Sequence, residues 1–301
     1  MIYNSLIAKT ATIFKTNFLE EIMMIKTTID TEEIAKFNKS SEKWWDETGE
    51  YSLLHKMNPV RIEYIKECAA LYLQCINHTL YYNKYKIPDN TCIDIINSYQ
   101  IIEAEAGSCD YLPLDGYKIL DIGCGGGILS IPLKRLGGEI VGIDAGIDNI
   151  KAARLHAQNM KIAIDYINTT SEELAKSQKH IGSYDIVLCM EVIEHVADFK
   201  LILDSVAKLL KDGGIFILST ISRTLNSFVK AIFFAEYALN IVPRGTHSWK
   251  KFLKPSEIVQ HLETRGFSLR DIKGLEFSIL TQSWRSTNGV NTNYILCMQK
   301  T

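Results

Sequence analysis

YKILDIGCGGGILSIPL, residues 117–133, runs from an apolar stretch into a cluster of glycines and back into apolar residues. Four of the five residues from 123 to 127 are glycine. The pattern predicts a strand over 118–123 that turns directly into a helix over 128–137. In an open α/β sheet, ligands bind beyond the carboxyl ends of the strands, where glycine lets a ligand approach the backbone. The stretch therefore predicts a ligand-binding turn in an α/β fold.

The spacing of the glycines argues against two common nucleotide-binding loops. The dinucleotide fingerprint G-x-G-x-x-G would need glycine at Ile128, and the chain has no GKS or GKT sequence. Asp144 ends the next predicted strand, EIVGID, where a carboxylate can accept hydrogen bonds from both ribose hydroxyls. The alternative is that Asp144 only caps the following helix. We expect a nucleoside cofactor other than NAD beside Asp144 and the alternate glycines, which are Gly123, Gly125 and Gly127.

Strand and helix patterns alternate from residue 117 onward. Short apolar runs separated by amphipathic stretches are typical of βαβ units and a mostly parallel sheet. Near the end of the chain, hairpin-like spacing predicts one antiparallel strand at the sheet edge. The predicted strands are KILDIG, EIVGID, IAIDYIN, YDIVLCM, IFILSTI, SLRDIKGLEFS and TNYILCMQK.

The part of the chain before residue 117 has helical patterns. Asp30 precedes Glu33 by three residues, which is typical of a helix N-terminus. A second helix is expected to begin near Pro59. We expect helices within 28–80 to pack on an α/β domain that spans 117–301.

The composition of the 301-residue chain is that of an ordinary globular protein, with 47% hydrophobic and 23% charged residues. A net charge of -2 gives no basic field, so we expect no nucleic-acid partner. The seven cysteines include no CxxC pair, which favours reduced thiols in a cytoplasmic protein. No segment has the ~20 apolar residues needed to span a bilayer.

Several longer segments resemble one enzyme family. ILDIGCGGG and VGID are similar to motifs I and II of class I S-adenosylmethionine-dependent methyltransferases. Together with the segments at 33–65, 189–196 and 235–255, they closely resemble the ubiquinone biosynthesis O-methyltransferases, which methylate ubiquinone precursors. The resemblance covers about 28–68 and 117–299.

The resemblance implies both a fold and a domain organisation. The family fold is a Rossmann-like α/β fold whose seven-stranded, mostly parallel sheet has an antiparallel edge strand and helices on both faces. We expect an N-terminal extension over 1–27, a helical region over 28–116 and a methyltransferase domain over 117–301. The extension and an apparent insertion at about 69–115 depart from the family pattern.

The resemblance also implies the cofactor S-adenosylmethionine, with S-adenosylhomocysteine as product. The Arg61 guanidinium would then pair with the methionyl carboxylate, and Met190 would pack against adenine. The alternatives are that Arg61 is a solvated helix charge and that Met190 only completes a core strand. The expected cofactor-binding residues are Arg61, Gly123, Gly125, Gly127, Asp144 and Met190.

The sequence MEVIEHV, residues 190–196, carries the candidate catalytic groups. A phenol, with a reference pKa of about 10, needs a base or a Lewis acid before it can accept a methyl group at neutral pH. If a helix begins here, Glu191 and His195 lie on one face with Glu194 adjacent. Glu191, Glu194 and His195 can then bind a divalent metal, for which the resemblance implies Mg²⁺, or His195 can act directly as a base with Glu191. The alternative is that the acids only stabilise a helix N-terminus and the histidine is a surface group.

Residues 227–245 form an unusually apolar segment flanked by basic residues. One interpretation is a core helix or a lid over a substrate pocket. The other is an interfacial helix that contacts a lipid surface and collects a polyprenyl substrate. The resemblance implies a cytoplasmic protein peripherally associated with the inner membrane, with other ubiquinone-synthesis enzymes as further partners.

These observations predict an S-adenosylmethionine-dependent O-methyltransferase of ubiquinone biosynthesis. Its expected substrate is a polyprenylated catechol or hydroquinol, such as a polyprenyl-dihydroxybenzene or a demethylubiquinol. Two alternatives stay open, which are a methyltransferase of another small phenol and a non-catalytic cofactor-binding subunit of a quinone-synthesis complex.

Overall fold

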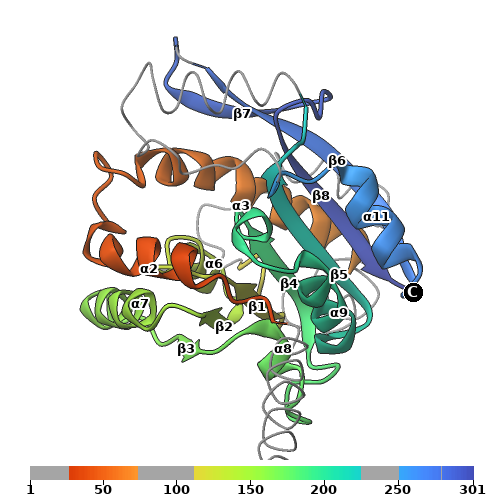
Figure 1. Cartoon of the computed structure of the whole chain (residues 1–301), viewed down its shortest axis with the longest axis horizontal. Coiled ribbons are helices and arrows are strands. Elements are labelled where there is room, and N and C mark those ends of the chain that lie inside the picture. The colour runs from red at the N-terminus through yellow and green to blue at the C-terminus, as the bar shows by residue number, and fades with distance from the viewer. Residues whose placement is uncertain (1–26, 74–111, 225–250, 279) are drawn as a thin grey trace, which may run out of the picture.

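A mixed sheet of eight strands carries the fold within the described residues (Figure 1). The structure is a computed structural model that describes residues 27–73, 112–224, 251–278 and 280–301. The strand order is β3-β2-β1-β4-β5-β8-β6-β7. The strands are β1 (Lys118–Ile122), β2 (Glu139–Asp144), β3 (Asp165–Asn168), β4 (Tyr184–Met190), β5 (Leu210–Ile221), β6 (Phe267–Ser278), β7 (Ser283–Thr287) and β8 (Asn293–Lys300).

The predicted fold class, a Rossmann-like α/β sheet covered by helices, is confirmed. Strands β3, β2, β1, β4 and β5 pair in parallel, whereas β8 runs antiparallel to both β5 and β6. The helices of the described residues are α2 (Thr31–Lys39), η1 (Ser41–Lys43), α3 (Ser52–Tyr72), α6 (Ser130–Arg135), α7 (Ile147–Asn159), α8 (Ser171–Leu174), η2 (Ile193–His195), α9 (Phe199–Leu209) and α11 (Pro255–Glu263).

Two details of the predicted sheet are wrong. The sequence TNYILCMQK, predicted as an edge strand, forms β8 inside the sheet, between β5 and β6. Its residues from Tyr294 to Met298 are all buried, as expected of a strand that is covered on both faces. The strand count is eight rather than seven because SWRST forms the edge strand β7, whose half-exposed polar residues give no strand pattern in the sequence.

Alternation along the central strands explains why helices cover both faces of the sheet. Ile119 and Leu188 pack with residues of α3 and α6 in one buried cluster. Leu120 and Cys189 point the other way and pack with residues of α9 and α11.

The helical region has one expected start and one unexpected start. The Asp30 side chain accepts a hydrogen bond from Glu33 N at 3.2 Å, so the predicted N-cap of α2 is confirmed. By contrast, α3 begins at Ser52, and Pro59 lies within it. Near the proline, Asn58 Nδ2 donates to the carbonyl of Ile128 at 2.9 Å, which fastens α3 to the glycine turn.

Residues 1–26, most of the expected 69–115 insertion and the whole apolar segment 227–245 lie outside the described residues. Within the described ranges, no helix combines the length and the apolar character that crossing a bilayer requires.

The glycine turn after β1 leaves room for the protein's own side chains. Gly125 and Gly127 adopt left-handed backbone, with φ of 52° and 82°. A Cβ on Gly125 would come within 2.6 Å of the Trp44 ring, and a Cβ on Gly127 within 2.3 Å of Tyr166 Oη. The glycines are therefore needed for the turn conformation and for close packing as well as for any ligand.

We expect Gly127→Ala to lower the free energy of unfolding by about 2–5 kcal/mol. Left-handed backbone costs a side chain about 1–2 kcal/mol, and displacing Tyr166 adds about 1–3 kcal/mol. Gly182→Ala is the matched control, since Gly182 has a φ of 55° but an added Cβ meets nothing within 4 Å. It is expected to lose only the backbone contribution. Urea unfolding measures both variants, and equal losses would contradict the packing argument.

Candidate active site

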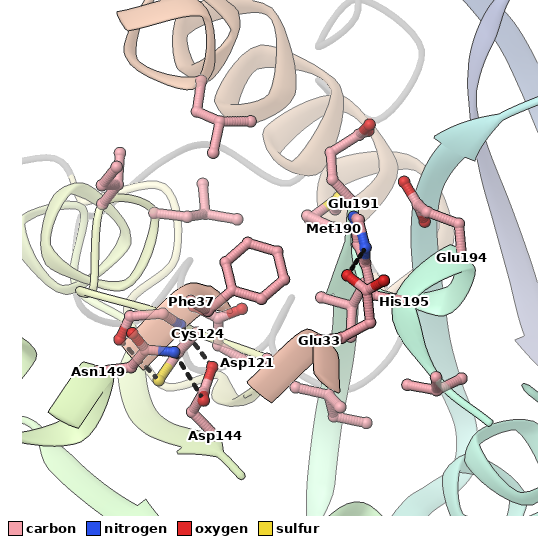
Figure 2. Close-up of a pocket in the computed structure, with 18 of the residues that line it drawn as sticks. Glu33, Phe37, Asp121, Cys124, Asp144, Asn149, Met190, Glu191, Glu194 and His195 are labelled. Carbon is pink, nitrogen blue, oxygen red and sulfur yellow. Dashed lines mark hydrogen bonds and ion pairs between the residues drawn. The ribbon is translucent and has the colours of Figure 1, made fainter. Parts of the chain in front are cut away.

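A cavity of about 590 Å³ lies at the carboxyl ends of β1, β2 and β4 and is bordered by α2 and α3 (Figure 2). Parallel strands bring residues that are distant in sequence to this common edge. Gly127 does not line the cavity, because the space for its side chain faces Tyr166. The predicted site residues that do line it are Arg61, Gly123, Gly125, Asp144, Met190, Glu191, Glu194 and His195.

Asp144 connects the glycine turn to the start of α7. Its Oδ2 accepts a hydrogen bond from Gly125 N at 3.0 Å. Its Oδ1 accepts from Gly146 N at 2.7 Å and from Asn149 Nδ2 at 3.1 Å. Burial raises the pKa of Asp144, while these hydrogen bonds act against the rise. The carboxylate is thus oriented at the cavity edge and also satisfies backbone next to α7, so the ligand and capping interpretations are compatible.

Aromatic side chains from the helical region cover the turn. Trp44 Nε1 donates to Asn149 Oδ1 at 2.9 Å, and the indole stacks on Tyr51 with ring centroids 3.8 Å apart. The same indole lies against Gly125, and Phe37 lines the cavity between this cluster and His195. These residues were not among the predicted site residues. The sequence signal for them is the aromatic pair in SEKWWDE, which lies in a segment that resembles the family.

Arg61 is buried, which is why the solvated-charge interpretation of this residue is wrong. It is 4% exposed, and burial lowers the pKa of its guanidinium. Its Nη2 lies 3.4 Å from Glu191 Oε1, and neither its Nε nor its Nη2 has a hydrogen-bond partner among the described residues. A buried guanidinium at a cavity wall with unfilled donors is suited to an anionic ligand group.

The backbone at Glu191 does not continue into a helix. Glu191 has a φ of 55°, and the following turn, η2, is a short 3-10 helix over Ile193–His195. The expected helical register of Glu191 with His195 is therefore wrong. The left-handed residue instead directs Glu191 toward Ser219, whose Oγ donates to its Oε1 at 2.7 Å.

Glu194 and His195 each have a separate partner. Thr220 Oγ1 donates to Glu194 Oε2 at 2.7 Å, and burial together with the charge of Glu191 raises the pKa of Glu194 to about 7. His195 Nδ1 lies 3.1 Å from Glu33 Oε2. Burial works against the imidazolium, but the hydrogen bond with Glu33 and the neighbouring carboxylates outweigh it and raise the pKa of His195.

The motif residues do not form the expected metal ligand set. Within the described ranges, no group of three or more His, Cys, Asp or Glu side chains is arranged to hold a metal ion. The physical reason is that Glu191, Glu194 and His195 are each turned toward a different protein group.

Comparisons with known proteins were made on the whole chain. A family model described as "Methyltransferase domain" matches residues 94–272. The "Ubiquinone biosynthesis O-methyltransferase" of Pelagibacter ubique (strain HTCC1062) is 40% identical over 267 residues, which are 89% of this chain and 96% of that protein. The protein of the same name from Dinoroseobacter shibae (strain DSM 16493 / NCIMB 14021 / DFL 12) is 41% identical over 270 residues, 89% of this chain and 95% of that protein. A solved structure of magnesium protoporphyrin IX methyltransferase from Synechocystis PCC 6803 with bound SAH has 22% sequence identity and a TM-score of 0.45, covering 69% of this chain and 81% of that one.

We expect Glu191→Gln to lower the free energy of unfolding by about 3–5 kcal/mol, because it leaves the buried Arg61 charge without its anionic partner. Glu276→Gln is the matched control, since Glu276 lies at the same 3.4 Å distance from Arg285 but in an exposed pair. Such a pair contributes about 0–1 kcal/mol. Chemical denaturation measures both, and similar small losses would show that Arg61 does not depend on Glu191.

Proposed function

The chain belongs to the ubiquinone biosynthesis O-methyltransferase family, and from this membership we propose that it methylates a phenolic hydroxyl of a ubiquinone precursor. The observation that carries the proposal is identity of 35–41% to proteins of that name over about nine-tenths of the chain. The proposed methyl donor is S-adenosylmethionine, which supplies an electrophilic methyl group bonded to a sulfonium.

The cavity residues fit this cofactor. The unfilled donors of Arg61 suit the methionyl carboxylate, and the Asp144 carboxylate at the end of β2 suits the ribose hydroxyls. Gly123 and Gly125 present backbone at the same wall, and Met190 offers an apolar surface there. Gly127 has a supporting role in this proposal, because it shapes the turn without lining the cavity.

His195 is the proposed general base. Its imidazole accepts the phenol proton as the phenol oxygen attacks the methyl carbon. Glu191 has a different proposed role from the proton transfer expected of it, since its carboxylate accepts from Ser219 and lies beside Arg61. Glu191 then holds Arg61 in place for the cofactor carboxylate.

A divalent metal has no step in this mechanism, because Glu191, Glu194 and His195 do not fit as one ligand set in the observed arrangement. The magnesium requirement that the resemblance implies stays a prediction. A chelator arm in the activity assay tests it.

The proposed acceptor is a polyprenylated catechol or hydroquinol. Apolar residues of α3 and of the β6–β7 hairpin, which include Leu54, Phe277 and Trp284, line the cavity and support an apolar substrate. Peripheral inner-membrane association through 227–245 and contacts with other ubiquinone-synthesis enzymes stay predictions. The interfacial interpretation of that segment is tested by liposome flotation of the double variant Phe233→Glu/Phe234→Glu, which should float less than the unsubstituted chain.

The decisive experiment is transfer of a labelled methyl group from S-adenosylmethionine to a prenylated catechol, with and without chelator. We expect His195→Gln to lower kcat by about 10²–10⁴-fold, because it removes the base, while S-adenosylhomocysteine still binds. A non-catalytic cofactor-binding subunit would bind S-adenosylhomocysteine and transfer no label. Label transfer only to short, unprenylated phenols would favour the small-phenol alternative.

The cofactor assignment has its own prediction. Asp144→Asn is expected to weaken S-adenosylhomocysteine binding by about 10–100-fold, since hydrogen bonds to a charged group contribute about 1.5–3 kcal/mol. Asp148→Asn is the matched control, because Asp148 lies on the same loop-to-α7 segment but is exposed and pairs with Lys151. Isothermal titration calorimetry measures both dissociation constants. An unchanged value for Asp144→Asn would remove the carboxylate from the cofactor site.

A further inference from the structure

Glu33, on α2, faces His195 across the cavity wall (Figure 2). Its Oε2 lies 3.1 Å from His195 Nδ1, although the two residues are 162 positions apart in the sequence. Both side chains are nearly buried, at 11% and 14% exposed. An acid so well enclosed needs a partner, and the imidazole is the group that its Oε2 contacts.

The remaining oxygen of Glu33 is held by cations. Lys36 Nζ lies 3.1 Å from Oε1 and Lys251 Nζ lies 3.5 Å from it, while Lys251 also contacts Asp30 at 2.8 Å. The hydrogen bond with His195, then that with Lys36, lowers the pKa of Glu33 to about 2. Glu33 is therefore an anion at neutral pH and can only accept hydrogen bonds.

The position of α2 is fixed from both sides. Thr28, just before the helix, donates through its N and its Oγ1 to Glu172 at 2.9 Å each. The carbonyl of Thr28 accepts from Ala197 N at 3.1 Å, directly after the segment that carries His195. One turn after Glu33, the Phe37 ring meets the imidazole edge-on at 5.1 Å. Glu33 thus reaches His195 from a rigid support.

We propose that Glu33 is a positioning residue for methyl transfer, whose carboxylate holds His195 in the tautomer with the proton on Nδ1 and the lone pair on Nε2. This rests on the proposed role of His195 as general base. In the reaction, the phenol proton moves to Nε2, the phenol oxygen bonds to the methyl carbon, and the electron pair of the broken carbon–sulfur bond remains on sulfur. The imidazolium that forms is stabilised by the Glu33 carboxylate until Nε2 releases the proton to solvent.

A carboxylate demands a proton on Nδ1, whereas an amide can either accept from Nδ1 or donate to it. Glu33→Gln therefore removes the constraint on the tautomer with little change in size. Glu32→Gln is the matched control, because Glu32 is the adjacent residue of α2 and is exposed. His195→Gln identifies the His195 signals by their loss from the spectrum.

The test combines a spectroscopic and a kinetic measurement on the full chain. Two-bond ¹H–¹⁵N correlation spectra, recorded above the titration of the imidazole, report which ring nitrogen of His195 carries the proton. We expect the Nδ1–H tautomer in the unsubstituted protein and in Glu32→Gln, and a mixed population in Glu33→Gln. With the prenylated catechol, kcat of Glu33→Gln should fall by about 10–100-fold, within the range that a general base contributes. The KM for the catechol and S-adenosylhomocysteine binding should stay within about twofold.

Several outcomes would overturn the proposal. An Nε2–H tautomer in the unsubstituted protein does so without any variant, so the test does not depend on Glu33→Gln folding. An unchanged tautomer in folded Glu33→Gln, or a fall in kcat without a tautomer change, would reduce Glu33 to a structural role. If the unsubstituted protein transfers no methyl group but shows the expected tautomers, the proposed function fails while the Glu33–His195 geometry holds.

Discussion

Close packing of the Trp44 indole on the glycine turn is the contact on which the rest of the site depends. A Cβ on Gly126 would come within 2.4 Å of this ring, so the turn and the helical region fit together only if the backbone there is bare. The indole is also fixed by its hydrogen bond to Asn149, which in turn donates to Asp144. The helical region that begins at Thr28 is thereby held over the carboxyl ends of the strands. This placement brings Glu33 and Phe37 of α2 to His195, which comes from the opposite side of the cavity.

The cavity is acidic, and its charges are compensated from several elements. Burial raises the pKa of Asp121 to about 6, against the opposing effects of its hydrogen bond from Ser130 and of the Arg61 charge. Glu194 behaves similarly, with a pKa raised to about 7. A wall with several carboxylates favours a positively charged ligand, which supports the proposal of a sulfonium cofactor. Arg61 brings a buried positive charge to the same wall, where an anionic group of that ligand can pair with it.

The sequence predicted those parts of the structure that depend on local periodicity. Buried strands such as YDIVLCM are recognisable because nearly every residue is apolar, and Asp144 could be placed at a strand end for the same reason. The edge strand SWRST was missed because an edge position does not require apolar residues. The register of Glu191 with His195 was wrong because a φ of 55° at one residue cannot be read from a helical pattern. The packing of Trp44 on the glycines was missed because it joins segments about 80 residues apart, which no local pattern encodes.

The MEVIEHV segment illustrates how one motif supports two chemical interpretations. Two carboxylates and an imidazole at close spacing have the composition of a metal site, but buried charges must also be compensated when no metal is considered. In the structure, the partners come from three different places: Arg61 of α3 faces Glu191, Thr220 of β5 binds Glu194, and Glu33 of α2 binds His195. A buried carboxylate or imidazolium with no partner would cost several kcal/mol, so each of these contacts constrains the element that supplies it. The motif therefore connects both helices of the covering region to the centre of the sheet, and the geometry of the proposed base is set by residues far from it in the sequence.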